Sequence, residues 1–201
     1  MSIRALSDDV IVLTPPTAAD TDAITAICQD PQIAAWTTVP HPYRREHAEG
    51  FVSDLVAPGW ENGTDLTWAI RDPSALVGMV GLAGVADGSA EVGYWLAPTA
   101  RGRGLLTRAL RLVLAAAFDP GGLELARVSW QAFVGNWPSR RVAWRVGFRV
   151  EGTVRLHTVQ RDGTRRDSWL GTILAGDPRE PNEPWPGDAP VPNTAERGPV
   201  P

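Results

Sequence analysis

The stretch between residues 90 and 107 constrains the fold more than any other part of the chain. An apolar strand runs directly into a turn rich in glycine and arginine, and a long helical pattern starts within that turn. The first amides of a helix have no intrahelical acceptor and point at one spot, where the helix dipole adds about half a positive charge. Gly102 and Gly104 allow an anion to approach the backbone, and Arg101 and Arg103 add full charges. The stretch predicts a phosphate-binding turn, although an ordinary connecting loop would show the same spacing.

The charge of the chain is concentrated in this region. All 19 basic residues are arginine, and the formal net charge of the chain is −4. Most of the arginines fall within residues 101–170, which makes this segment basic and the remainder acidic. An acidic protein is a poor general binder of nucleic acid, whereas a basic segment within it suits a compact polyanion such as a nucleotide. We therefore expect a nucleotide-like ligand and no nucleic acid partner.

Two common phosphate motifs do not fit the turn. The Walker A loop ends in Gly-Lys-Ser/Thr, and this chain contains no lysine. The dinucleotide fingerprint G-x-G-x-x-G matches Gly102 and Gly104 but fails at Thr107. It also needs an acid at the end of the following strand, where none stands. The sequence therefore excludes a P-loop and a Rossmann site.

Hydrophobic periodicity predicts a mixed α/β (α+β) domain. We expect helices from Thr17 to a stop at Pro31 and over residues 45–56, 103–117 and 137–146, and strands over residues 10–13, 67–71, 76–85, 91–96, 126–133, 148–159 and 166–174. Antiparallel hairpins are followed by a single strand–helix–strand crossover. This order predicts a mixed, mostly antiparallel twisted sheet of about seven strands flanked by about four helices.

Composition divides the chain near residue 175. The segment 176–201 holds eight of the 18 prolines and few apolar side chains, so it has little to bury. We expect one domain over residues 1–175 and a proline-rich tail over 176–201, mostly extended, with Trp185 packing onto the domain.

The single cysteine, Cys28, excludes an intrachain disulfide and indicates a reducing compartment. No apolar run reaches the roughly 18 residues of a membrane helix, and the first residues lack an apolar signal core. Cytoplasmic localisation without a membrane partner is expected, and a homodimer is left open. The histidines and Cys28 show no ligand spacing, so we expect no metal.

The turn resembles the acyl-CoA signature of the GNAT N-acyltransferase superfamily, which reads Arg/Gln-x-x-Gly-x-Gly/Ala. Arg101-Gly102-Arg103-Gly104 follows Gly93-Tyr94-Trp95-Leu96 as in that family, and the last signature position is Leu106, where the family usually has a small residue. The match is closest to the RimJ/RimL-type branch and covers about residues 8–175. It extends through Trp36…Pro40-His41-Pro42-Tyr43, Asn136-Trp137-Pro138-Ser139, Val146-Gly147-Phe148, Glu151-Gly152 and Arg166-Asp167-Ser168-Trp169.

The resemblance implies a GNAT-like domain whose sheet is splayed at an acyl-CoA site, with acetyl-CoA as cosubstrate and no metal. Pantetheine would lie against the backbone of Leu96 and Ala97. The pyrophosphate would meet the turn and the amides of the first helical residues, with Asn136 bonding the pantetheine and Arg140 a phosphate. The helical residues concerned are Leu105, Leu106 and Thr107.

Acyl transfer to an amine requires a base for the amine and a partner for the leaving thiolate. Glu91, on the strand that leads into the turn, is the candidate base, although a structural ion pair would explain it equally well. His157 is the rival, and Asp167 matches a family position near the acceptor pocket. By resemblance, Ser139 would stabilise the thiolate, whereas capping of a helix by Asn136 would also explain this pair.

The function expected is transfer of an acetyl group from acetyl-CoA to a primary amine of a protein N-terminus or a small molecule. Trp36 and Tyr43 would line the acceptor side, together with His157 and Asp167. Two alternatives remain at this point. One is an acyltransferase that uses a larger donor such as succinyl-CoA, and the other is a CoA-binding sensor without catalysis.

Overall fold

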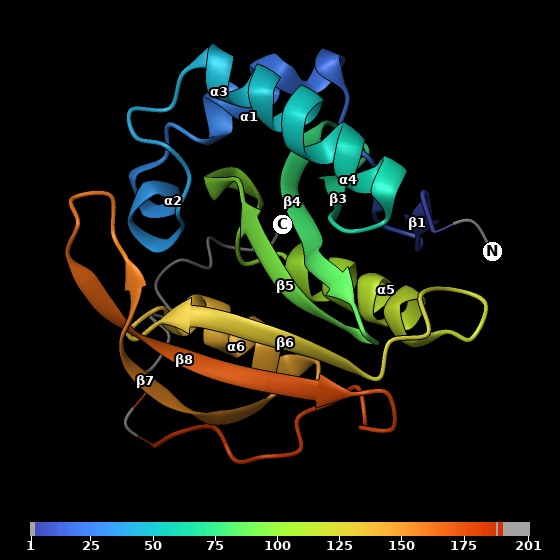
Figure 1. Ribbon diagram of the computed structural model, residues 1–201, viewed down its shortest axis with the longest axis vertical. Coiled ribbons are helices and arrows are strands. Elements are labelled where there is room, and N and C mark those ends of the chain that lie inside the picture. The colour runs from blue at the N-terminus through green and yellow to red at the C-terminus, as the bar shows by residue number, and fades with distance from the viewer. Residues whose placement is uncertain (1–2, 188, 191–201) are drawn as a thin grey trace, which may run out of the picture.

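A computed structural model describes residues 3–187 and 189–190. Its centre is one eight-stranded sheet with the strand order β1-β2-β3-β4-β5-β6-β8-β7 (Figure 1). The strands are β1 (Leu6–Ser7), β2 (Val12–Thr14), β3 (Leu66–Arg71), β4 (Leu76–Ala86), β5 (Ser89–Leu96), β6 (Arg127–Phe133), β7 (Arg149–Val159) and β8 (Arg165–Leu174). Every neighbouring pair is antiparallel except β5 and β6, which are parallel. The predicted mixed, mostly antiparallel sheet is confirmed.

The sheet opens between β5 and β6. These two strands pair over four residue pairs only, from Ser89 opposite Arg127 to Val92 opposite Trp130. Beyond them β5 continues to Leu96 and β6 to Phe133, and the two strands diverge (Figure 1). The opening lies next to the glycine-rich turn, which is where the splay was expected.

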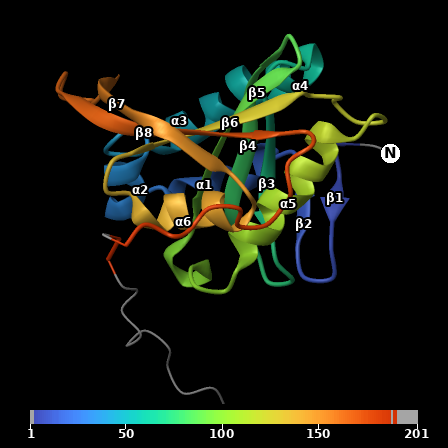
Figure 2. The same ribbon diagram turned by 90° about the horizontal axis from the view of Figure 1, so that it is seen from below.

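Helices cover both faces of the sheet (Figures 1 and 2). They are α1 (Thr21–Ile27), α2 (Pro31–Trp36), α3 (Arg45–Gly50), α4 (Ala57–Asn62), α5 (Leu105–Phe118) and α6 (Trp137–Arg145), with a π-helical segment (Phe51–Val56) between α3 and α4 and single 3-10 turns at Ala18–Asp20 and Pro98–Ala100. The apolar face of α5 is buried against one face of the sheet. Side chains of α1 to α3 pack on the opposite face of β3 and β4.

Alternation along β3 explains this two-layer core. Trp68 and Ile70 belong to the cluster under α5, while Ala69 between them joins the cluster under α1. Successive side chains of a strand point to opposite faces, so one strand supplies both layers. Leu, Ala and Arg favour the long helix α5, and Pro120 stands just beyond its end at Phe118.

The structure corrects three details of the expected order. Strand β1, of two residues, was not predicted because so short a strand leaves no alternation to detect. Pro31 does not end the first helix, which stops at Ile27, but opens α2, because proline fits a first helical position and Asp30 caps this helix. The helix expected over residues 45–56 continues through α4 to Asn62, with Pro58 placed in its first turn.

The first part of the predicted tail lies along α6 (Figure 2). The Trp185 ring contacts those of Trp137 and Trp144, with ring centroids 6.1 and 5.3 Å apart. The Trp144 indole donates a hydrogen bond to the Glu183 carbonyl (2.7 Å). Residues 188 and 191–201, which belong to the same predicted segment, lie outside the described residues.

Candidate active site

The glycine-rich turn presents open backbone amides at the N-terminus of α5. Gly102 and Gly104 both have a φ of +77°, a conformation that favours glycine, and a Cβ at either would meet nothing within 4 Å. Gly104 is the N-cap residue, and no side chain caps this helix. The first amides of α5 are therefore available to an external acceptor, as the sequence predicted.

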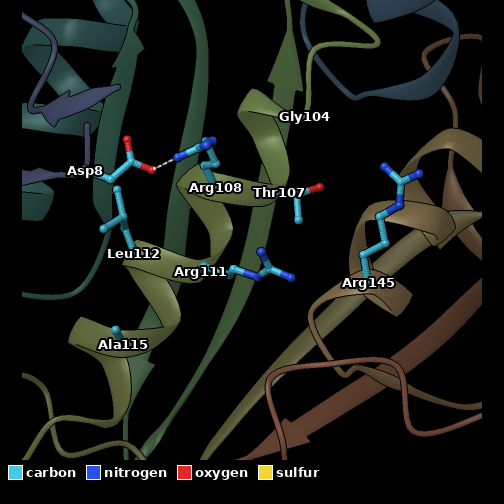
Figure 3. Close-up of a pocket in the computed structure, with 8 residues that line it drawn as sticks. All are labelled: Asp8, Gly104, Thr107, Arg108, Arg111, Leu112, Ala115 and Arg145. Atoms are coloured by element: carbon cyan, nitrogen blue, oxygen red, sulfur yellow. Dashed lines mark hydrogen bonds and ion pairs between the residues drawn. The ribbon is translucent and has the colours of Figure 1, made fainter. Parts of the chain in front are cut away.

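A pocket of about 490 Å³ adjoins this helix start and reaches across to α6 (Figure 3). It is lined by Asp8, Gly104, Thr107, Arg108, Arg111, Leu112, Ala115 and Arg145. Arg108 pairs with Asp8 and Asp9, with both N–O distances 2.9 Å. Among the salt bridges of the described residues, none involves Arg111 or Arg145. These two arginines therefore give the pocket a positive charge that suits a phosphate.

The two arginines of the turn itself point elsewhere. Arg101 pairs with Asp30, the cap of α2, and donates a hydrogen bond to the Leu96 carbonyl (3.2 Å). Arg103 pairs with Asp72 (2.9 Å). Hydrogen bonds from Ser74 and from Arg103 lower the pKa of Asp72 to about 2. Both side chains thus connect the turn to neighbouring segments. The backbone amides remain as hydrogen-bond donors to an anion.

The N-terminus of α6 faces the opening between β5 and β6. The Asn136 side-chain oxygen accepts a hydrogen bond from the Ser139 amide (3.2 Å), so Asn136 caps this helix. The Ser139 hydroxyl accepts a hydrogen bond from the Trp130 indole (3.1 Å) and donates one to the Tyr94 hydroxyl (3.2 Å). Tyr94 lies on β5 and Trp130 on β6, so both diverging strands hold Ser139 at the opening.

The Tyr94 hydroxyl donates in turn to the Ser139 carbonyl (3.0 Å). Burial raises the pKa of Tyr94, so its hydroxyl keeps its proton at neutral pH. Tyr94, Trp130 and Ser139 thus form a neutral group beside the opening, in which each hydroxyl and indole proton has an acceptor within the group.

Glu91 lies on the opposite face of β5 from Val92, away from α5. Solvent reaches its side chain, yet the surrounding protein raises the pKa of the Glu91 carboxyl above its ordinary value, and nearby His157 opposes this rise. A carboxylate with a raised pKa is a better proton acceptor than an ordinary one. The structure therefore brings together the two residues proposed as alternative bases.

His157 belongs to a hydrogen-bonded group on β6, β7 and β8. Its Nε2 lies 3.1 Å from the Gln131 side-chain oxygen. The Gln131 amide nitrogen donates to the Thr158 hydroxyl (2.6 Å), which lies 3.0 Å from the Ser168 hydroxyl. Three side chains from three strands, Gln131, Thr158 and Ser168, thus hold the imidazole on the face that carries Glu91.

The remaining predicted site residues are spread around this region. Trp36 is half-buried at the end of α2, with the Arg166 guanidinium 4.9 Å from its ring centre. Tyr43 is 6% exposed within the cluster of α1 and α3, so we infer a packing role for it. Asp167 accepts a hydrogen bond from the Leu156 amide (2.7 Å). The Arg140 guanidinium stacks on Trp169, 4.5 Å from the ring centre.

Sequence reasoning missed two groups of residues. Arg111 and Arg145, which line the pocket, are not among the phosphate contacts expected from the sequence. The signal for Arg111 was present, since Gly104, Thr107, Arg108, Arg111 and Ala115 are spaced as one helical stripe that starts at the turn. Tyr94 and Trp130 gave no such signal, because an aromatic residue on an apolar strand has the pattern of a core residue.

The described residues contain no group of three or more histidine, cysteine or acidic side chains that could hold a metal ion. Within the same residues, no helix has both the length and the apolar character needed to cross a membrane.

Comparison with known proteins agrees with this geometry. A family model described as acetyltransferase (GNAT) domain matches residues 11–149. YdaF of Bacillus subtilis (strain 168), named provisionally as a ribosomal N-acetyltransferase, is 42% identical over 110 residues. That match covers 51% of this chain and 58% of YdaF, so the chain matches little more than half of that relative's length.

Two solved structures share the fold. RimJ of Mycobacterium smegmatis, in complex with CoA-disulfide, has a TM-score of 0.75 and 27% sequence identity, covering 86% of this chain and 85% of that one. The Microcin C7 self-immunity acetyltransferase MccE, in complex with acetyl-CoA and AMP, has a TM-score of 0.76 at 19% identity, covering 83% and 93%. The chain therefore belongs to the GNAT family of acetyltransferases.

Proposed function

We propose that this GNAT protein transfers the acetyl group of acetyl-CoA to a primary amine. The observation that carries the proposal is the parallel pair β5–β6, which separates after four residue pairs and leads directly to a turn with open helix amides. An extended pantetheine chain fits between diverging strands whose backbone groups are unpaired, and the pyrophosphate fits at the helix N-terminus. The pocket with Arg111 and Arg145 then adjoins the remaining phosphate of the donor.

The two faces of the opening suit the two halves of the reaction. The amine nitrogen attacks the thioester carbon, a C–N bond forms, and the C–S bond breaks. Glu91 accepts the proton that the amine loses, directly or through water. The Ser139 hydroxyl, held between Trp130 and Tyr94, turns its one proton from Tyr94 toward the departing thiolate on the other face.

The acceptor is proposed to be a protein N-terminus or a small-molecule amine. The name of YdaF refers to ribosomal acetylation, which places peptides with free N-termini first in the choice of acceptors. A larger acyl-CoA donor such as succinyl-CoA remains the second candidate for the cosubstrate.

Mass spectrometry of products tests the proposal. The protein is incubated with acetyl-CoA or succinyl-CoA and a panel of N-terminal peptides and small amines, while CoA release is followed. We expect an acetylated product from at least one amine. Acetyl-CoA binding without any product across the panel would favour a sensor, and no binding would overturn the proposal.

Gly104→Asp is the matched loss-of-binding variant, because it adds a negative side chain where the pyrophosphate is proposed. Gly63→Asp is its control. Gly63 also has a positive φ (+71°) and open space around a Cβ, so it carries the same strain and charge far from the turn, at the end of α4. We expect calorimetry to show lost acetyl-CoA binding in the first variant alone.

A further inference from the structure

Strand β7 departs from regular pairing beside His157. Val154 pairs with Ser168 and Thr158 with Arg166, so three residues of β7 stand opposite the single residue Asp167 of β8. This is a bulge in an edge strand. Leu156, at its centre, has a φ of +49° and is 59% exposed, which is an unfavourable conformation for a branched side chain that contributes little to the core. A strained segment of this kind points to a role outside packing.

The bulge turns His157 toward the Glu91 face. In a regular strand, His157 would point to the opposite face from its neighbour Thr158. Here both side chains contact Gln131. Gln131 lies two residues after Ser129, the residue that pairs with Glu91, so Gln131 and Glu91 share one face of the sheet. The additional residues of the bulge are what allow two successive side chains to reach one face.

Asp167 holds the bulge in place from β8. Its carboxylate accepts the Leu156 amide at 2.7 Å, which satisfies a backbone donor that the irregular pairing would otherwise leave without a strand partner. Arg165, also on β8, donates to the carbonyls of Leu156 and His157 at 3.0 and 3.2 Å. The bulge is thus fixed at its amide and at two carbonyls by side chains of the neighbouring strand.

We infer that Asp167 is a positioning residue, which holds the β7 bulge so that His157 completes the proton-accepting group on the amine side with Glu91. The inference rests on the proposed function. In this role Asp167 acts through the backbone of Leu156 and does not contact the substrate. A hydrogen-bond acceptor is what this role requires, and a negative charge is not.

Asp167→Asn and Asp167→Ala separate the two roles. Asparagine retains an acceptor oxygen for the Leu156 amide, and alanine does not. We expect Asp167→Ala to lower kcat/KM for the amine by about ten- to a hundredfold, with the KM for acetyl-CoA unchanged, because His157 is misplaced. Asp167→Asn should stay within about threefold of the wild type. Equal losses in both variants would show that the charge contacts the acceptor, and the inference would fail.

A double variant tests whether Asp167 acts through His157. Asp167→Ala combined with His157→Gln should be no slower than the slower of the two single variants. Multiplied losses would mean independent roles and would overturn the inference. If Asp167→Ala does not fold, Arg165→Ala, which removes the donors to the bulge carbonyls, should show the same non-additivity with His157→Gln.

Nuclear magnetic resonance separates failure of this inference from failure of the proposed function, because it needs no acceptor. The chain has three histidines, and His157→Gln assigns the imidazole signal of His157. That signal should move in Asp167→Ala and remain in place in Asp167→Asn. An unmoved signal in Asp167→Ala would sink the inference, whereas a moved signal in a protein that acetylates no amine would leave the bulge role intact and remove the acetyl-transfer role.

Discussion

Glu91 and Ser139 lie on opposite sides of the same short stretch of β5. Glu91 is itself part of the strand, while Ser139 reaches the strand through Tyr94, three residues further along. Because adjacent side chains of a strand alternate, this odd separation places a carboxylate and a hydroxyl on the two faces. A substrate that passes between β5 and β6 would therefore meet a proton acceptor on one side and a hydrogen-bond donor on the other.

Replacement of Glu91 tests its role as the proton acceptor. A carboxylate accepts a proton only when ionised, and the pKa of Glu91 is raised by its surroundings. Activity of the wild type should therefore fall, as the pH is lowered, at a higher pH than an ordinary glutamate would require. Glu91→Gln should lower kcat/KM at neutral pH and recover partly at high pH, where free amine is abundant. A pH–rate series for Glu91→Gln and His157→Gln measured together checks this, and a wild-type profile for Glu91→Gln would reject the assignment.

Replacement of Ser139 tests the thiolate partner. Ser139→Ala should lower kcat by about ten- to a thousandfold and leave the dissociation constant for acetyl-CoA nearly unchanged, because the hydroxyl acts on the leaving group. Tyr94→Phe, which removes the hydroxyl behind Ser139, should have a smaller effect in the same direction. Steady-state kinetics combined with calorimetry distinguish the two constants. An unchanged kcat in Ser139→Ala would mean that Ser139 has only a structural role at the start of α6.

At the scale of elements, the sequence predicted long segments well and short ones poorly. Strand β5, helix α5 and helix α6 were found within two residues of their ends, because each carries a long periodic pattern and a clear stop. Helix α2 was missed because its first residue, Pro31, is also a common stop signal. The bulge in β7 was missed because neither Leu156 nor Asp167 breaks the alternation of side chains visible in the sequence.

At the candidate site, the local backbone of the turn could be predicted from the sequence, and the contacts between distant side chains could not. The turn at Gly102 and Gly104 follows from local backbone chemistry, which is readable in sequence. The partners of Ser139 depend on how β5, β6 and α6 come together, and no local pattern encodes such contacts. The ion pair between Arg101 and Asp30 likewise joins residues far apart in the chain.

Arg111 of α5 and Arg145 of α6 line the pocket at the helix start and take part in none of the salt bridges of the described residues. Arg111→Ala or Arg145→Ala should weaken acetyl-CoA binding by about tenfold, the loss expected for one charge-assisted hydrogen bond. The remaining binding should depend less on salt. Arg127→Ala, an exposed arginine outside the pocket, is the control. Calorimetry at two salt concentrations measures both effects, and equal behaviour of all three variants would remove the pocket from the cofactor site.

At the scale of the whole molecule, residues 176–187 are held against α6 and the residues that follow it. Arg179 donates to the carbonyls of Leu174 and Ala175 (3.0 and 2.8 Å), and the Asn182 amide donates to the Gly147 carbonyl (3.2 Å). A Cβ on Gly147 would lie 2.2 Å from the Pro178 carbonyl, so only glycine lets the two segments approach this closely. The helix that carries Ser139 and Arg145 is thus held between the sheet and this segment.

Truncation after Ala175 tests how much these contacts contribute. Loss of the Trp185 ring contacts and of the hydrogen bonds to α6 should lower the free energy of unfolding by about 2–4 kcal/mol. The melting temperature should fall by roughly 5–15 °C. A chain that ends at Pro190 keeps every contact named above and serves as the reference in the same thermal scan. Equal melting temperatures would support an independent domain over residues 1–175.

The short pairing between β5 and β6 has a consequence for hydrogen exchange. Only four residue pairs join the two halves of the sheet, so the backbone of β5 beyond Val92 has no strand neighbour on that side. A bound pantetheine would take this place as a temporary strand. Those amides of residues 93–96 that point away from β4 should exchange rapidly in the free protein and become protected when acetyl-CoA is present. The two half-sheets would then open together instead of separately.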